Sequence, residues 1–93
     1  MVIGLLHASL SIPESRSLKD KRSALRSLKD RLRNEMNISV AEMGKQDLWN
    51  AAELAFVTVA NEKLVVEQRL SAVTERLRSN PRVVLLDVHT ELF

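Results

Sequence analysis

The chain has 93 residues with no cysteine, two glycines, two prolines and a formal net charge of +2. This length predicts a single domain over residues 1–93, with one core and no long linker. The lack of cysteine excludes a disulfide framework and thiolate chemistry, and it fits a cytoplasmic location. No apolar run approaches the roughly 20 residues that span a bilayer, and the apolar N-terminus lacks the basic residues of a signal peptide. We therefore expect a cytoplasmic protein without membrane contact.

The first two predicted elements are a strand and a basic helix. Apolar alternation predicts a strand over residues 2–12, which Pro13 ends. Ser17 is a typical helix N-cap, with Asp20 at the third helical position as in a capping box. The helix is expected to run to about Met36. Its apolar stripe at helical spacing consists of Leu18, Leu25, Leu28, Leu32 and Met36.

The second half repeats this alternation of strands and helix. Residues 38–43 predict a short strand closed by Gly44, and residues 45–51 a loop. Residues 52–60 are apolar on both faces, which is typical of a central strand. Asn61 is a candidate cap for a second helix, which Asn80-Pro81 ends. The inner stripe of this helix is expected to be Val66, Leu70, Val73 and Leu77. The last strand is predicted over residues 83–90.

The resulting order, βαββαβ, predicts an α+β ferredoxin-like fold, a four-stranded antiparallel sheet with both helices on one face. The other face of the sheet would then be open. Its expected apolar residues are Ile3, Leu5, Val57, Val59, Val83 and Leu85. Because an exposed apolar face usually marks an interface, we expect a homo-oligomer. A partly covered face on a monomer is the alternative.

The predicted first helix concentrates positive charge. Residues 16–36 carry eight basic and three acidic side chains, a local +5, and the rest of the chain sums to −3. At about 100° per residue, five of the cations form a ridge of roughly 16 Å beside the apolar stripe. Cations in the first turns oppose the helix dipole, which suggests function. The candidate nucleic-acid-binding residues are Arg16, Lys19, Lys21, Arg22, Arg26, Lys29 and Arg33.

Two interpretations of this ridge stay open. It is either a surface for the backbone phosphates of folded RNA or the solvated edge of a core helix, whose methylenes cover the apolar stripe. The start of the helix, Ser15–Lys19, would also suit a phosphate. A hydrolase acting there on a phosphorylated substrate is the enzymatic alternative. We expect no enzyme, because the chain has no glycine-rich phosphate loop and no distinctive Ser–His–acid spacing.

Two further features concern the histidines and the loop. His7 and His89 are expected on the open face, on neighbouring strands. Two histidines without a third ligand make a poor metal site, so we expect no metal and no cofactor. In the loop, Trp49 either plugs the end of the core or stacks on a partner. Its neighbours in the candidate loop contact are Lys45, Gln46 and Asp47, of which Asp47 is expected to cap a local turn.

Several motifs together resemble the YlxP-like family, a bacterial family without an assigned function. They are IPESRSLKDKR (12–22), RSLKDRLRN (26–34), SVAEMGKQDLWNAAEL (39–54) and NPRVVLLD (80–87). The resemblance covers essentially the whole chain and implies the ferredoxin-like fold. Family genes often lie beside those for translation initiation factor two and ribosome-binding factor A, which implies a link to ribosome maturation or translation. Many relatives have His before the Gln of the loop, where this chain has Lys45.

We therefore expect a small, non-enzymatic, cytoplasmic protein that binds ribosomal RNA or a ribosomal particle through the basic helix. The alternative is a homo-oligomeric interaction module that uses the open sheet face and has no nucleic-acid role.

Overall fold

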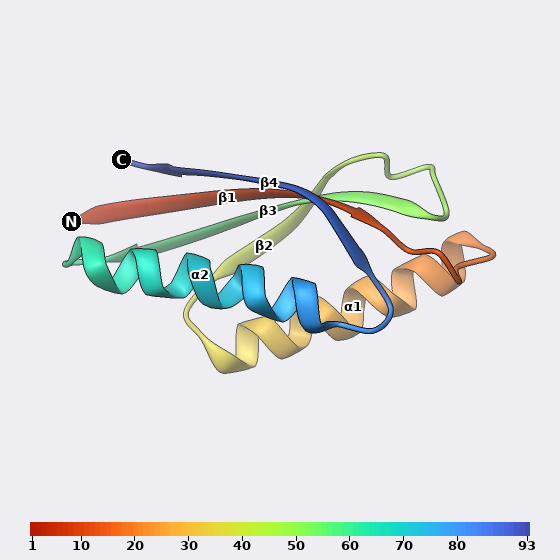
Figure 1. Cartoon of the computed structure of the whole chain (residues 1–93), viewed down its shortest axis with the longest axis horizontal. Helices are drawn as coiled ribbons and strands as arrows, with labels where there is room; N and C mark the ends of the chain where they lie inside the picture. The colour runs from red at the N-terminus through yellow and green to blue at the C-terminus, as the bar shows by residue number, and fades with distance from the viewer.

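Four antiparallel strands form one sheet, and two helices cover one of its faces (Figure 1). The computed structural model describes all 93 residues. The elements are β1 (Val2–Ser11), α1 (Leu18–Glu35), β2 (Ser39–Gly44), β3 (Ala51–Ala60), α2 (Lys63–Ser79) and β4 (Val84–Leu92). The strands lie in the order β2-β3-β1-β4. The predicted ferredoxin-like arrangement is thus confirmed. No helix is long and apolar enough to cross a membrane.

The core lies between the sheet and the helices, on the strand face predicted from alternation. Leu6, Ala8 and Leu10 of β1 are buried, as are Leu54 and Phe56 of β3. The predicted stripes of both helices are also largely buried: Leu25, Leu28 and Leu32 of α1, and Val66, Leu70, Val73 and Leu77 of α2. Because these residues recur at the period of their own element, their burial follows from local pattern alone.

Gly4 lets α2 pack closely against β1. A Cβ atom at this position would lie 2.4 Å from Val66 Cγ1 and 3.1 Å from Leu70 Cδ1. Neither distance leaves room for a side chain. The glycine near the start of β1, where every other residue of the strand carries a side chain, is therefore explained by the helix that crosses it.

Two expectations about the open face are wrong. Val83 is buried in the core, and Leu85 packs against the core from β4. The pairing of β1 with β4 shifts register between Ser9 and Leu10, which leaves one extra residue in β4. Such a bulge reverses the facing of every residue before it, so Val84 rather than Val83 points to the open face.

The predicted helix caps have mixed outcomes. Ser17 is the N-cap of α1, and its hydroxyl accepts a hydrogen bond from the Asp20 amide at 3.0 Å. The Ser17 cap is thus confirmed, whereas Asp20 accepts from the Arg16 amide at 3.0 Å rather than from the Ser17 amide that a capping box would use. At α2 the expectation is wrong, because the N-cap is Glu62 rather than Asn61, and no side chain caps the helix.

Candidate functional site

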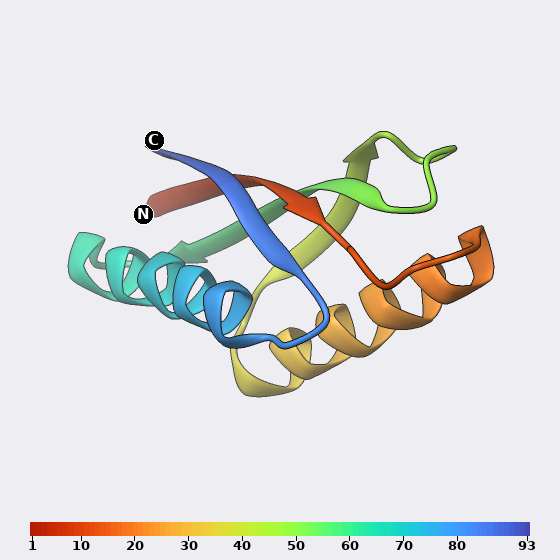
Figure 2. The same cartoon turned by 45° about the vertical axis from the view of Figure 1, so that its right-hand side comes forward.

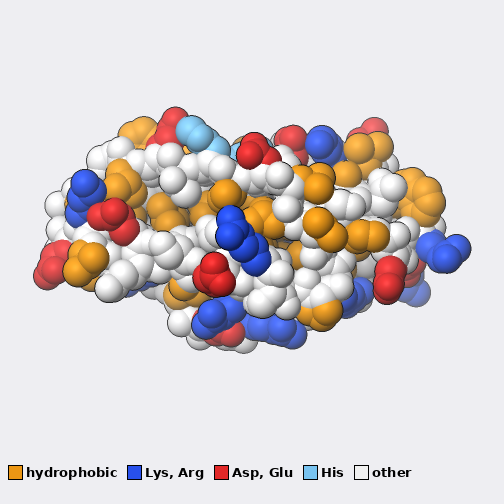
Figure 3. Space-filling view, viewed as in Figure 1, with side chains coloured by type: hydrophobic (Ala, Val, Ile, Leu, Met, Phe, Trp, Pro, Cys, Tyr) orange, Lys and Arg blue, Asp and Glu red, His pale blue; other side chains and the backbone are white.

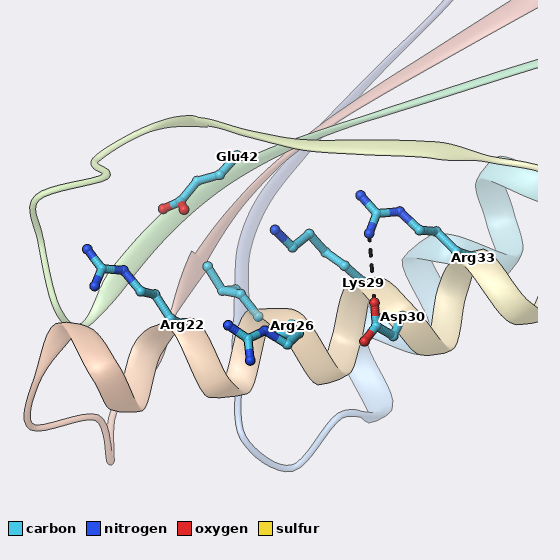
Figure 4. A pocket seen from close by; sticks show the side chains of 7 residues that line it. Arg22, Arg26, Lys29, Asp30, Arg33 and Glu42 are labelled. Carbon is cyan, nitrogen blue, oxygen red and sulfur yellow. Dashed lines mark ion pairs between the residues drawn. The ribbon is translucent and has the colours of Figure 1, made fainter.

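A groove of about 390 Å³ runs between α1 and the edge strand β2 (Figure 4). It brings together four of the seven basic residues predicted to bind nucleic acid. Its lining consists of Arg22, Leu25, Arg26, Lys29, Asp30, Arg33 and Glu42. The helix supplies all of them except Glu42, which comes from β2. Arg16 and Lys19 lie outside the groove, exposed near the start of α1.

Three cations in this groove have no acidic partner. Arg22, Arg26 and Lys29 take part in none of the ion pairs of the molecule. Arg33 differs, because its Nη1 lies 3.8 Å from Asp30 Oδ1 and its Nη2 donates to the Val40 carbonyl at 3.0 Å. The free positive charge is thus concentrated toward the N-terminal half of the groove.

Across the wider surface, positive charge also gathers on the side of the helices. In Figure 3, Lys and Arg side chains gather along the lower border, over the helices. The upper border, over the sheet, carries mostly acidic, histidine and hydrophobic side chains. An anion approaching the helical side therefore meets a more positive surface than the net charge of +2 suggests.

Lys21 does not belong to this surface, and its predicted contact with nucleic acid is wrong. Its side chain is only 2% exposed. Its Nζ donates to the carbonyls of Lys45 and Leu48, both at 2.6 Å, and lies 2.9 Å from Glu42 Oε2. Glu42 Oε2 is itself buried and has no partner of good hydrogen-bond geometry, so this ion pair is its main polar contact. Lys21 instead joins α1 to β2 and the following loop.

The sequence holds a signal for this role. On the helical wheel Lys21 falls at about 300°, between Leu28 at about 280° and Leu32 at about 320°. A lysine in the centre of an apolar stripe must be buried, and a buried ammonium needs acceptors from another segment. The contacts also show that two motifs of the sequence, KDKR in α1 and QDLW in the loop, form one structural unit.

The loop 45–50 lies near the start of α1 (Figure 2), beyond the Arg22 end of the groove (Figure 4). Its turn is closed by the Leu48 amide, which donates to the Lys45 carbonyl at 3.0 Å, and Lys45 has a positive φ of 59°. Gln46 reaches back to the Glu42 carbonyl at 3.4 Å. Trp49 is 46% exposed, so it is not a buried plug of the core. Its indole ring is available to a partner.

The start of α1 is occupied by its own contacts. The Asp20 carboxylate holds the Arg16 amide, and the Ser15 hydroxyl donates to the Ser17 carbonyl at 3.1 Å. Ser15 is also only 6% exposed. The Arg16 amide and the Ser15 hydroxyl, which a phosphate or a phosphorylated substrate would need at this helix end, are therefore already used within the chain.

The open sheet face has an apolar end and a polar end. Val57 and Val59 are 40% and 45% exposed, and Ile3 and Leu5 beside them are half-buried. Toward the other end, His7 and His89 lie on the neighbouring strands β1 and β4, as predicted, and the structure pairs them directly. His7 Nε2 lies 4.0 Å from Glu53 Oε2, and His89 Nε2 lies 3.2 Å from Glu91 Oε1.

Comparison with solved structures supports the fold. LFR1 1, a de novo designed protein with a ferredoxin fold, has a TM-score of 0.58 at 13% identity, covering 99% of this chain and 85% of its own. A C-terminal segment of the alpha subunit of aIF2 from Pyrococcus abyssi has a TM-score of 0.51 at 18% identity, covering 92% and 49%. At such identities the likeness shows the fold alone.

Comparison of sequences identifies the family. The uncharacterized protein YlxP of Bacillus subtilis (strain 168) is 29% identical over 92 residues, which cover 99% of this chain and all of that protein. Residues 3–90 match the family described as protein of unknown function (DUF503). The YlxP-like resemblance is thereby confirmed, and the chain belongs to the DUF503 family.

Proposed function

We propose that the protein binds structured RNA, as found in ribosomal RNA or a ribosomal particle, through the groove between α1 and β2, and catalyses no reaction. The observation that carries the proposal is the set of three unpaired cations, Arg22, Arg26 and Lys29, in one groove. The choice of a ribosomal partner is supported by the genes that often lie beside those of this family, which encode translation initiation factor two and ribosome-binding factor A.

The spacing of the three cations favours a polymer over a small anion. Residues 22 and 29 are separated by about 10 Å along the helix axis at about 1.5 Å per residue. That separation suits successive backbone phosphates better than one phosphate group. Guanidinium groups also match phosphate geometry, since they donate two parallel hydrogen bonds.

The sheet offers no alternative platform for RNA bases. Sheet-based RNA recognition stacks bases on exposed aromatic residues of the central strands. Here the only Phe, Tyr or Trp of β1 and β3 is Phe56, which is fully buried, and the imidazole of His7 lies 4.0 Å from the Glu53 carboxylate, whose charge repels RNA. The exposed Trp49 lies in the loop at the end of the groove and can stack on one unpaired base. We therefore expect phosphate contacts along α1 and at most one stacked base.

The test is co-sedimentation with purified small ribosomal subunits across a salt series. The groove variant carries Arg22→Glu, Arg26→Glu and Lys29→Glu. A matched control carries Lys63→Glu, Arg78→Glu and Arg82→Glu, three exposed cations outside the groove with the same change in charge. We expect wild-type binding that weakens steeply with salt, retention by the control, and a loss of at least about 100-fold in the groove variant.

Two results would overturn the proposal. One is absence of wild-type binding at low salt. The other is an equal loss in both triple variants, because the binding would then follow net charge rather than the groove. Circular dichroism of all three proteins establishes that the variants are folded.

The open sheet face supports a second candidate, a homo-oligomeric interaction module. The specific observation is the partial exposure of Val57 and Val59 beside Ile3 and Leu5. Its test is Val57→Lys, which should lower the molecular mass in solution and leave RNA binding unchanged. A mass that Val57→Lys does not alter would exclude this face as the oligomer interface.

A further inference from the structure

The two edges of the sheet differ in how their backbone groups are satisfied. β2 forms one edge and β4 the other. On β2, the Val40 carbonyl accepts from Arg33 and the Glu42 carbonyl from Gln46. No side chain bonds to the backbone of β4. β4 also contains no lysine, arginine or proline, residues that commonly protect an edge.

The register shows which groups of β4 point outward. Ile3 and Phe93 exchange both backbone hydrogen bonds, at 3.1 and 2.8 Å. Hydrogen-bonded and non-hydrogen-bonded pairs alternate in an antiparallel ladder. Three pairs of β1 and β4 are therefore non-hydrogen-bonded: Gly4 with Leu92, Leu6 with Thr90, and Ala8 with Val88. The amides and carbonyls of Val88, Thr90 and Leu92 point away from β1, toward the open edge.

We propose that two copies of this chain associate through β4, antiparallel, with Thr90 on the twofold axis. Val88 then faces Leu92 of the second copy, and Thr90 faces itself. This register uses all three outward residues and forms about six hydrogen bonds between the copies. The two sheets become one sheet of eight strands. The inference does not depend on RNA binding.

The side chains on the open face fit the same register. Residues 89 and 91 lie on either side of the axis, so His89 of one copy faces Glu91 of the other, twice. Within one chain, His89 Nε2 and Glu91 Oε1 lie 3.2 Å apart. Each copy therefore brings one imidazole and one carboxylate close to the twofold axis. Residues in such a non-hydrogen-bonded pair have close side chains. The edge is thus self-complementary, as a twofold interface requires.

The helix side of the axis offers two apolar side chains, Leu70 and Leu92, within a lining that is otherwise polar and includes Glu67 and Ser71. A groove of about 200 Å³ lies between α2 and β4, lined by Leu70, Thr74, Thr90 and Leu92 among others. Leu92 is 38% exposed there. Pairing places Val88 of the second copy next to Leu92 and extends the apolar layer across the axis.

The β4 edge fits a second copy better than the open sheet face does. A stack of two open faces would bury His7, Glu53 and Lys45, which form ion pairs at 4.0 and 3.7 Å. Taking such charges out of water is costly. Edge pairing leaves them in solvent and satisfies backbone groups that are otherwise unpaired.

The first test is the molecular mass in solution, by sedimentation equilibrium over a range of concentrations. Wild type should reach twice the 10.5 kDa of one chain. Thr90→Pro removes an amide that has no partner within the chain, so the monomer should keep its fold and the mass should fall to that of one chain. Thr90→Ala, which keeps the amide, is the control and should remain dimeric. Thermal unfolding followed by circular dichroism checks the fold.

The second test fixes the register by cross-linking, which is clean because the chain has no cysteine. Thr90→Cys should form a disulfide between copies on mild oxidation, since paired Cα atoms lie roughly 5.5 Å apart. Val88→Cys should not, because its copies would lie about 14 Å apart at about 3.4 Å per residue.

A monomeric wild type overturns the proposal. So does a dimer that persists in folded Thr90→Pro; if Val57→Lys dissociates it, the open face is the interface instead. A dimer that does not cross-link through Thr90→Cys, or that does cross-link through Val88→Cys, contradicts the placement of Thr90 on the twofold axis.

Discussion

The two helices cover the same face of the sheet, but two arginines of α2 and three cations of α1 are used in opposite ways. In α2, Arg69 Nη1 donates to Thr58 Oγ1 and the Val59 carbonyl, both at 3.0 Å, and Arg76 Nε lies 2.6 Å from Glu35 Oε2. These arginines hold α2 to the sheet and to α1. In α1, Arg22, Arg26 and Lys29 hold nothing within the chain. The difference teaches that pairing, rather than the number of charges, marks a surface as free for a partner.

Lys21 and Arg33 are the cations of α1 that do have partners within the chain, and Lys21 sharpens the contrast. It lies one residue from Arg22, yet its ammonium group is enclosed by two carbonyls and a carboxylate. Adjacent cations on one helix thus have unrelated roles, because about 100° of rotation separates their directions.

The largest predicted effect is at Lys21. Lys21→Ala leaves the Glu42 carboxylate and two loop carbonyls without their shared donor, and should lower the free energy of unfolding by about 3–5 kcal/mol. Urea denaturation measures this loss. Lys19→Ala, an exposed neighbour on the same helix, is the control and should stay within about 0.5 kcal/mol. Equal effects at the two positions would mean that Lys21 is dispensable to the fold.

The second prediction tests how closely α2 packs. Gly4→Ala places a methyl group 2.4 Å from Val66 Cγ1 and should cost about 1–3 kcal/mol of unfolding free energy. The double variant Gly4→Ala, Val66→Ala removes the clash, so its loss should be smaller than the sum of the two single losses. Strict additivity in thermal or urea unfolding would contradict the close approach.

The third prediction concerns a paired cation of α2. Arg69→Ala removes two charge-assisted hydrogen bonds to β3 from a partly exposed side chain, and should cost about 1–2 kcal/mol. Arg31→Ala removes an exposed arginine of α1 that forms no ion pair and should have almost no effect. If the two losses are the same, the proposed division between the helices fails.

The smallest predicted effect is at the free cations. The triple variant Arg22→Gln, Arg26→Gln, Lys29→Gln should change the unfolding free energy by less than about 1 kcal/mol, in either direction, because no ion pair is lost. The same variant should weaken binding to ribosomal subunits strongly. A loss of several kcal/mol in urea unfolding would show that these residues stabilise the fold.

Sequence patterns predicted the fold because they are local to each element. Alternation placed Leu6, Ala8 and Leu10 inside, and helical spacing did so for Leu25 and Leu28. The bulge in β4 was not predictable in this way, because its effect on Val83 and Leu85 depends on pairing with β1. Both residues were therefore expected on the wrong face.

The candidate site was predicted in part for the same reason. The helical wheel places Arg22, Arg26, Lys29 and Arg33 on one side, and the groove contains all four. The wheel does not show that β2 supplies the opposite wall, or that Glu42 reaches Lys21. Those facts require contacts between residues about twenty positions apart, which spacing within one element does not reveal.

Because the ammonium group of Lys21 is enclosed by the loop, its chemical reactivity depends on whether the loop is open. The chain has five lysines, and Lys21 is the only buried one. Acylating reagents attack a free amine, so they should label the N-terminus and the other four lysines quickly. Lys21 can react only when the loop releases it from Lys45 and Leu48. The labelling rate of Lys21 relative to an exposed lysine, resolved by peptide mass, therefore gives the fraction of molecules in which this loop is open.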